Sequence, residues 1–239
     1  MTWPAVAWNQ VPTMSSAALR QADEQARSQF GIEPIQLMEV AGWQIARFVD
    51  GFMHGVRAKR VIIVAGSGNN GGDALVAARF LQQRGAIVRA SIVPTRDPSS
   101  LVARHALTIG RLGIPILEAP KGVDPSADLL VDGLFGIGIR LPLRDPAPGI
   151  ITAINASRVP IVAIDVPSGL DADSGAGQEG AVRAAATITL VAPKPALRGS
   201  LVAGRVIVAD IGMPIGVFST ERVALARLYQ IGDTVELTN

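Results

Sequence analysis

From Arg60 onward the chain alternates between short apolar runs rich in β-branched residues and longer segments with helical spacing. This alternation is typical of βαβ units, in which successive strands join one parallel sheet. The expected strands are 61–65, 86–93, 114–117, 129–132, 160–164, 187–191 and 206–209. The expected helices between them are 73–84, 99–112 and 148–156, and glycines at 85 and 113 can stop the first two. The sequence therefore predicts an α/β protein built on a parallel sheet.

Two amphipathic helices precede this alternating region. Ser15 or Ser16 can cap the first, and Gly31 can end it, whereas the second follows Pro34. Their apolar residues recur at helical spacing: Leu19, Ala22, Ala26 and Phe30 in the first, and Leu37, Met38, Ala41, Ile45, Phe48 and Phe52 in the second. Such stripes usually pack a helix against a core. No linker-like tract or repeat divides the chain, so we expect one domain over residues 1–239, with both helices laid against the sheet.

Composition narrows the class of protein. The chain has 239 residues, of which 49% are hydrophobic, enough to fill one sizeable core. Its 22 basic and 20 acidic residues leave a net charge of +2, too weak a field to indicate nucleic acid or an anionic membrane as the main partner. It contains no cysteine, which excludes disulfides and cysteine-based zinc sites. Residues 1–14 do not resemble a secretory signal, and no apolar run reaches the ~20 residues of a membrane span. We expect a soluble, cytoplasmic protein.

A glycine-rich turn, GSGNNGGD at 66–73, follows the first expected strand and opens the next expected helix. Gly66, Gly68 and Gly71 match the GxGxxG spacing of a phosphate-binding turn. Glycines there permit positive φ and close backbone approach, and the amides of the following helix attract a pyrophosphate. In this context the motif favours a nucleotide-like ligand, although a tight turn without any ligand would have the same spacing.

Two features separate this turn from that of an ordinary dinucleotide fold. Asn69, Asn70 and Asp73 add side-chain oxygens that can coordinate a hard cation or hydrogen-bond a ligand. The end of the next strand carries Thr95 and Arg96 instead of the acidic residue expected about 20 residues on, where it holds a ribose hydroxyl. This weakens the interpretation as an NAD-dependent dehydrogenase. Arg96 can instead meet a 2′-phosphate, or simply be solvated.

Polar residues also follow three later strands. Asp132 and Asp165 each end a buried run and lead into a glycine-containing loop, and Lys194 follows the strand 187–191. Ligands of open parallel sheets bind beyond the carboxyl ends of the strands, which makes these residues functional candidates. The alternatives are that the aspartates serve as turn or capping residues and that the lysine is a solvated surface charge.

The sequence gives little evidence for other kinds of catalytic or metal-binding site. His54 and His105 have no partner at the spacing of a metal site or a catalytic dyad, so both are interpreted as surface or packing residues. The sequence contains no GxSxG elbow, Walker lysine or HExxH motif. Their absence argues against serine hydrolases, P-loop enzymes and zinc proteases.

Six segments together form a more specific pattern than the glycine motif alone: LMEVAG at 37–42, AGSGNNGGDALVAAR at 65–79, VDGLFGIGI at 131–139, AIDVPSGLDADSG at 163–175, the segment around Lys194, and VADIGMP at 208–214. In this order they resemble the YjeF N-terminal family, the NAD(P)H-hydrate epimerases, over nearly the whole chain. The resemblance implies an α/β, Rossmann-like three-layer fold with a central, mostly parallel sheet and two N-terminal helices. It also implies an isomerase of nicotinamide cofactor repair, which interconverts the R and S forms at C6 of hydrated NADH and NADPH (NADHX and NADPHX).

The resemblance also implies roles for individual residues. The substrate-binding residues would be Asn69, Asn70, Gly71, Gly72, Asp73, Gly136, Ile137, Gly138, Ile139, Arg140, Leu141, Pro142 and Asp165. Asn70, Asp132 and Ser168 would bind K⁺, the expected cofactor, and their oxygens suit a large, hard monovalent cation. Asp165 and Lys194 would be the catalytic residues, with Asp165 beside the reactive ring.

A chemical route follows as a hypothesis. The ring nitrogen expels the C6 hydroxyl while Asp165 donates a proton, and water then re-adds to either face of the flat cation. The route requires burial to raise the pKa of Asp165 toward neutrality. Lys194 would steady either the carboxylate or a phosphate.

The sequence departs from the family pattern at four places. Val40 replaces the asparagine of LMENAG, and Ala74 replaces the last glycine of GGDG. Ala185 stands where aspartate is common, and Ala196 replaces a glycine that often follows the lysine. Their effect on activity is left open, but every polar residue named above is present, so we expect a working epimerase.

Two rival functions are considered. A non-catalytic nucleotide- or RNA-binding scaffold module of the same fold would be expected to lose the potassium and catalytic positions, which this chain keeps. An NADP-dependent oxidoreductase would transfer hydride, but the missing ribose acid counts against it. The resemblance further implies a homodimer and a functional coupling to a separate NAD(P)HX dehydratase. The sequence ends at Asn239 without the dehydratase domain of fused family members, so we expect epimerase activity alone.

Overall fold

The computed structural model describes residues 3–239 and contains a single nine-stranded sheet. Its strands are β1 (Ala5–Ala7), β2 (Arg60–Ala65), β3 (Ile87–Ile92), β4 (Ile116–Glu118), β5 (Leu129–Gly133), β6 (Ile161–Ile164), β7 (Ala186–Leu190), β8 (Arg205–Ala209) and β9 (Thr234–Thr238). Across the sheet they follow the order β1-β9-β8-β7-β6-β5-β2-β3-β4. All neighbours pair in parallel except β8 and β9, which are antiparallel. The predicted α/β fold with a mostly parallel sheet is confirmed.

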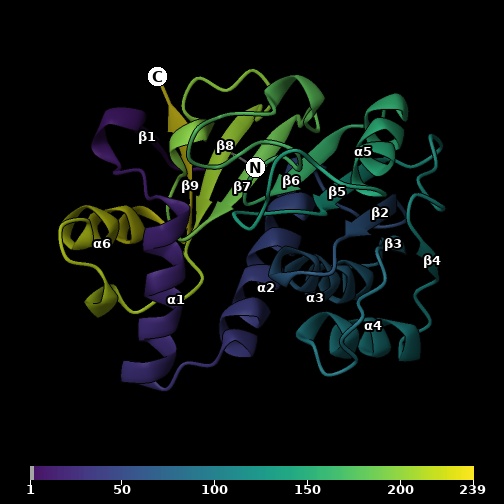
Figure 1. Cartoon of the computed structure of the whole chain (residues 1–239), viewed down its shortest axis with the longest axis horizontal. Helices are drawn as coiled ribbons and strands as arrows, with labels where there is room; N and C mark the ends of the chain where they lie inside the picture. The colour runs from purple at the N-terminus through teal and green to yellow at the C-terminus, as the bar shows by residue number, and fades with distance from the viewer. Residues whose placement is uncertain (1–2) are drawn as a thin grey trace.

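Helices cover both faces of the sheet. They are α1 (Ser16–Phe30), α2 (Pro34–Phe52), α3 (Asn69–Gln83), α4 (Leu101–Arg111), α5 (Ala147–Ala156) and α6 (Arg222–Ile231). In Figure 1, α1 to α4 follow one another along one side of the molecule, whereas α5 lies apart from them. No helix in the described part of the chain is long and apolar enough to cross a membrane.

Strand β2 shows how the sequence builds the two layers. Its side chains alternate between the faces, as the period of two in a strand requires. Val61 and Ile63 join the large core beneath α1 to α4 and α6, whereas Ile62 and Val64 join a smaller core with the isoleucines of α5. Because both faces are covered, the strand is apolar throughout after its first residue.

The two N-terminal helices begin where the sequence predicts. The Ser15 hydroxyl accepts the amide of Ala18, and Gly31, at φ +66°, ends α1 in the left-handed conformation. The apolar stripes are buried except at their last residues, since Phe52 is only partly buried. Phe30, the last residue of α1, keeps 49% of its surface exposed.

Several predicted boundaries are corrected by the structure. Helix α3 begins at Asn69 and not at Asp73, so the polar residues of the glycine-rich turn form its first turn. Strand β4 is shifted toward the C-terminus, to Ile116–Glu118. The sequence interpretation missed β1, β9 and α6, which lie at the two ends of the chain, outside the alternating region that signalled strands and helices.

The strand order reverses direction beside β2. The chain passes from β2 to β3 and β4 on one side, and then returns to β5 and continues through β6 and β7 on the other. The loops after β2 and β5 therefore diverge and leave a crevice at the carboxyl ends of the strands. Ligands of open α/β sheets bind at such a switch point.

Helix α2 crosses α3 at a glycine. A Cβ atom on Gly42 would lie 2.3 Å from Cγ1 and 2.5 Å from Cβ of Val76. We predict that Gly42→Ala lowers the free energy of unfolding by about 1–3 kcal/mol, the usual effect of overpacking a close helix contact. Urea denaturation measures the change.

Gly149 provides the matched control, because it lies in α5 and a Cβ there would meet no atom within 4 Å. Gly149→Ala is expected to stabilise the protein by about 0.5–1 kcal/mol through helix propensity. Equal effects of the two substitutions would contradict the packing described here.

Candidate active site

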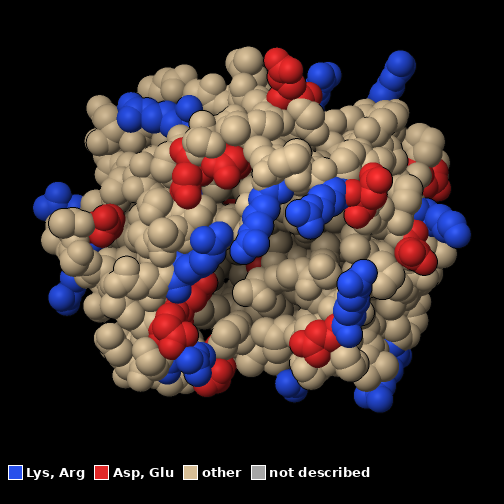
Figure 2. Space-filling view, in the orientation of Figure 1, with Lys and Arg blue, Asp and Glu red and all other residues tan. Residues whose placement is uncertain are grey.

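A cavity of about 560 Å³ occupies the crevice at the switch point. Figure 2 shows this face of the molecule hollowed near its centre, with basic and acidic side chains around the mouth. The lining comes from α1, α2, the start of α3 and the segments that follow β5, β6, β7 and β8. It comprises Leu19, Arg20, Asp23, Pro34, Leu37, Met38, residues 67–70, Asp73, residues 134–138, Asp165, Leu190, Val191, Lys194 and Ile211.

A buried ion pair joins the ends of two neighbouring strands. Lys194, after β7, donates to Oδ1 of Asp165, which follows β6, and only 1% of the lysine side chain is exposed. The same ammonium also donates to Thr189 Oγ1 at 3.1 Å and to the Leu190 carbonyl at 2.8 Å. A lysine has three N–H donors. All three therefore bind protein oxygens, so Lys194 steadies the carboxylate and has no donor left for a phosphate.

The backbone on both sides of this pair adopts an uncommon conformation. Asp165 has φ +69° and Val191 has φ +67°, in the left-handed region that a β-branched residue rarely enters. Three hydrogen bonds hold these turns: the Asp165 amide donates to the Ile188 carbonyl, the Val191 amide to the Ala209 carbonyl, and the Tyr229 hydroxyl to the Val191 carbonyl. Strain of this kind persists where the surroundings fix it, often at functional sites.

The glycine-rich turn is shaped by close approach and not by positive φ. None of Gly66, Gly68 and Gly71 is in the left-handed region, which corrects part of the expected reason for glycine there. A Cβ on Gly66 would lie 1.9 Å from the Leu134 carbonyl oxygen, and one on Gly71 would lie 1.9 Å from that of Gly66. A Cβ on Gly68, at the N-cap of α3, would meet nothing within 4 Å. No side chain caps α3, and the residues at its start, Gly68 to Asn70, line the cavity at the positive end of the helix dipole.

Asn70, Asp132 and Ser168, the three predicted potassium ligands, lie in one buried network. The Ser168 hydroxyl donates to Asp132 Oδ1 at 2.7 Å and accepts the Phe135 amide at 2.8 Å. The Asn70 side-chain amide donates to the Phe135 carbonyl at 2.8 Å. Burial raises the pKa of the fully buried Asp132 to about 6, although hydrogen bonds from Ser168 and Leu134 oppose the shift. The structure therefore brings the three side chains together around Phe135.

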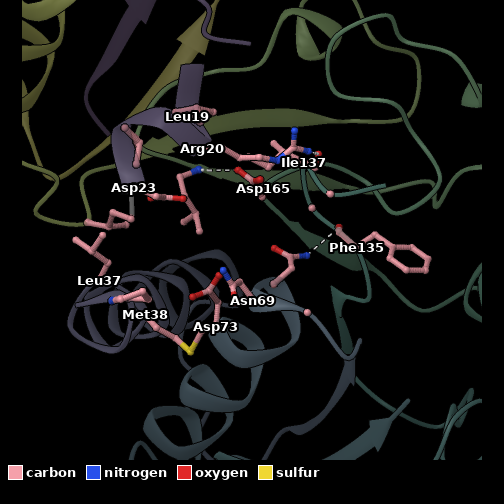
Figure 3. A pocket seen from close by; sticks show the side chains of 18 of the residues that line it. Leu19, Arg20, Asp23, Leu37, Met38, Asn69, Asp73, Phe135, Ile137 and Asp165 are labelled. Carbon is pink, nitrogen blue, oxygen red and sulfur yellow. Dashed lines mark hydrogen bonds between the residues drawn. The ribbon is translucent and has the colours of Figure 1, made fainter. Parts of the chain in front are cut away.

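Asp73 and Asp23 are two further carboxyls in the cavity (Figure 3). Asp73 is 8% exposed, and burial, together with the charges of Asp165 and Asp23, raises its pKa well above the ordinary value. Asp23 is open to the solvent of the cavity, yet the enclosing walls raise its pKa to about 6. The charge of Asp165 adds to this shift and that of Lys194 opposes it.

The substrate-binding residues expected from the sequence separate into two groups. Eight of the expected site residues line the cavity: Asn69, Asn70, Asp73, Gly136, Ile137, Gly138, Asp165 and Lys194. The remaining substrate-binding candidates lie outside its lining: Gly71, Gly72, Ile139, Arg140, Leu141 and Pro142. Gly72 lies against Met38, because a Cβ there would be 2.6 Å from the methionine sulfur. His54 is exposed and His105 is buried within α4, and neither lines the cavity, as expected for surface and packing residues.

Sequence reasoning missed the contribution of α1 and α2. Leu37 and Met38 pack in the core as predicted and also line the cavity. Arg20 donates to the Ile137 carbonyl at 2.7 Å and so ties α1 to the glycine-containing loop after β5. Asp23 lies one helical turn after the buried Leu19, and this spacing was the only signal in the sequence that it faces inward.

Two of the departures from the family pattern have a clear structural setting. Val40 is 38% exposed and does not line the cavity. Ala74 is fully buried, and its methyl group lies 2.5 Å from where a Cβ on Gly133 would stand. The methyl of Ala74 therefore packs over the last residue of β5, behind the cavity.

One known protein family matches most of this chain. The model described as "YjeF-related protein N-terminus" matches residues 34–196, which hold the glycine-rich turn, the ion pair and the buried network. The chain belongs to this family.

Individual relatives agree with the assignment. An NAD(P)H-hydrate epimerase of Aspergillus fumigatus is 39% identical over 133 residues, 52% of this chain and 53% of that protein. A bifunctional NAD(P)H-hydrate repair enzyme of Thermosynechococcus vestitus is 35% identical over 144 residues, 60% of this chain and 28% of that protein. The crystal structure of the yeast protein YNL200c is similar with a TM-score of 0.76 and 27% identity, covering 83% of this chain and 88% of that one. The match therefore spans about half the length of the fungal relative, and the yeast structure confirms the Rossmann-like fold.

The raised pKa of Asp23 is directly measurable. We predict that its carboxyl titrates at about pH 6 in ¹³C NMR of aspartate-labelled protein, with Asp23→Asn identifying the signal. Asp165→Asn removes a neighbouring negative charge and should lower the pKa of Asp23. Asp124, on the surface, is the internal control, because hydrogen bonds from Ser126 hold its pKa below the ordinary value. An Asp23 that titrates together with Asp124 would contradict the electrostatics described here.

Proposed function

We propose that this chain is an NAD(P)H-hydrate epimerase that interconverts the R and S forms of NADHX and NADPHX. The observation that carries the proposal is the buried Asp165–Lys194 pair, which faces a ligand-sized cavity at the switch point of a family member's sheet. The names of its relatives support the same activity. Epimerisation at C6 requires no net oxidation. It does require proton exchange, and the carboxyls in the cavity suit that task.

The lining matches the chemistry of a hydrated dinucleotide. The uncapped amides at the start of α3 suit the pyrophosphate, since helix N-termini bind anions. Leu19, Leu37 and Met38 supply an apolar wall for a ring. A Cβ on Gly136 would lie 3.1 Å from Asp165 Oδ2, so the glycine leaves this second carboxylate oxygen accessible beside the loop. We place the nicotinamide ring next to this oxygen.

Asp165 would then act chiefly through its charge. When the ring nitrogen expels the C6 hydroxyl, the ring becomes a cation, and a fixed carboxylate beside it stabilises that charge. Oδ1 of Asp165 accepts both the Lys194 ammonium and, at 3.3 Å, the Leu190 amide, so the carboxylate is held in one orientation before the reaction begins. This fixed orientation means that the group need not reorganise as the ring charge develops.

We further propose K⁺ as the cofactor, held by Asn70, Asp132 and Ser168. Asp132 is fully buried and has no ion-pair partner within residues 3–239, which leaves a carboxylate suited to a cation. The amide, hydroxyl and carboxylate oxygens around it are hard donors. When bound, the cation would neutralise Asp132 and order the loop around Phe135. We also propose functional coupling to a separate NAD(P)HX dehydratase, in line with the bifunctional nature of the related NAD(P)H-hydrate repair enzyme.

The decisive experiment follows the epimers directly. Purified protein is mixed with one epimer of NADPHX, and chiral chromatography monitors the appearance of the other against the spontaneous rate. We predict acceleration in potassium chloride and a lower rate in choline chloride at equal ionic strength. Asp132→Ala should abolish the difference between the two salts, because it removes the buried carboxylate of the proposed site.

Asp165→Asn is the second variant in this assay. Loss of a preorganised charge beside the reaction centre is expected to lower kcat about 10²–10³-fold. Glu118→Gln, at an exposed position in β4, is the control that should retain the wild-type rate. If the wild-type protein does not exceed the spontaneous rate in either salt, the chain is a non-catalytic binding module of the same fold.

A further inference from the structure

Epimerisation through a flat cation requires proton transfer on both faces of the ring. The hydroxyl leaves from one face, and water must add to the opposite face to give the other epimer. Departure requires a proton for the hydroxyl, and addition requires a base for the incoming water. On the proposed function, the cavity must therefore present a proton-exchanging group to each face of the ring.

One carboxyl reaches the cavity from α3. Asp73 is 92% buried, since 8% of its surface is exposed, and its side chain makes no hydrogen bond with any described residue. It points into the cavity from the α3 side (Figure 3). A nearly buried acid without a partner loses free energy unless a ligand satisfies it, which marks Asp73 as a group that meets the bound molecule.

A second carboxyl reaches the cavity from α1. In Figure 3, Asp23 projects from α1 on the side of the cavity away from Asp73, so the two acids approach the enclosed space from different walls. Helix α1 is held in place at two points. The Ser16 amide donates to Asp173 Oδ1 at 2.8 Å, and Arg20 donates to the Ile137 carbonyl at 2.7 Å. Asp23 therefore sits on a fixed wall of the cavity.

The charged groups that face Asp23 come from three other elements. They are Asp73 on α3, Asp165 after β6 and Lys194 after β7, with Arg20 on α1 itself also lining the cavity. Lys194 is committed to Asp165, so neither of these two residues is free to exchange protons between faces. The enclosing cavity walls and the charge of Asp165 raise the pKa of Asp23 to about 6, which suits a group that gives and takes a proton near neutral pH.

We propose that Asp23 is a catalytic residue that exchanges a proton with the C6 oxygen on the α1 side of the ring, while Asp73 does the same on the α3 side. For an epimer whose hydroxyl faces α1, Asp23 gives its proton to that hydroxyl as the C6–O bond breaks. The ring nitrogen lone pair forms the N1=C6 bond, and water leaves. Water then adds to C6 from the α3 side, the N1=C6 π pair returns to N1 as a lone pair, and the extra proton of the added water passes to Asp73, which begins as a carboxylate. Proton exchange with solvent restores the starting state of both carboxyls. In the reverse direction the two carboxyls exchange roles, so no oxidant or reductant is required.

Oxygen exchange distinguishes the reaction on the α1 side of the ring from the reaction on the α3 side. Each epimer of NADPHX is incubated with enzyme in H₂¹⁸O, and mass spectrometry after chiral separation records both inversion and ¹⁸O incorporation. In Asp23→Asn, inversion should fall by about 10²–10⁴-fold in both directions. One epimer, with its hydroxyl toward Asp73, should still exchange its oxygen without inversion, whereas the other should not. Asp73→Asn should show the reciprocal pattern.

Glu24→Gln is the control on the same helix, because Glu24 pairs with Arg27 at the surface and should retain wild-type inversion. Thermal unfolding establishes that each variant is folded. Asp23→Asn with wild-type inversion, or with equal loss of exchange for both epimers in a folded protein, would overturn the proposal. A wild-type enzyme without any acceleration would instead defeat the proposed function itself.

Discussion

The buried ion pair between Asp165 and Lys194 is the interaction on which the site depends. It joins the ends of two adjacent parallel strands, and the lysine donates all three of its N–H groups to protein oxygens. Burying two charges is costly unless geometry and hydrogen bonds are good, so the surrounding backbone must hold the pair firmly. The turns at Asp165 and Val191 do so in left-handed conformations, supported from the neighbouring strands and from Tyr229 of α6. The C-terminal helix thus contributes to a site that it does not line.

The charged side chains that line the cavity suit the proposed reaction. Three carboxyls, Asp23, Asp73 and Asp165, line the cavity with two basic groups, Lys194 and Arg20, and acidic groups beside the ring suit a ring that becomes cationic during the reaction. Enclosure within the cavity, together with the charge of Asp165, raises the pKa of Asp23 and Asp73 above the ordinary value, which suits groups that donate protons. In the role that we propose, Asp165 is a fixed counter-charge, and Asp23 and Asp73 carry the protons; the sequence-based hypothesis instead has Asp165 as the proton donor.

Local sequence patterns predicted much of the fold and part of the site. Alternating apolar runs located seven strands, capping residues located α1, and the position of Asp132 and Asp165 at strand ends brought both to the correct edge of the sheet. Asp23 and Arg20 were missed, because a helix stripe shows which side is buried but not which tertiary wall it faces. Strand β9 was also missed, since its pairing with β8 is antiparallel and involves residues far apart in sequence. The loop 139–142 was assigned by family resemblance alone, and the structure places it outside the cavity lining.

The central claim, that the Asp165–Lys194 pair is a buried and firmly held interaction, is tested most directly by a double-mutant cycle in urea. Asp165→Asn, Lys194→Met and the double variant are compared with the wild-type protein, and the exposed pair Arg27–Glu24 serves as the reference. Each single substitution should lower the free energy of unfolding by about 3–5 kcal/mol, because it leaves a buried group without its partner. The double variant should lose much less than the sum of the two. Losses of at most ~1 kcal/mol, as expected for the surface reference, would contradict the account.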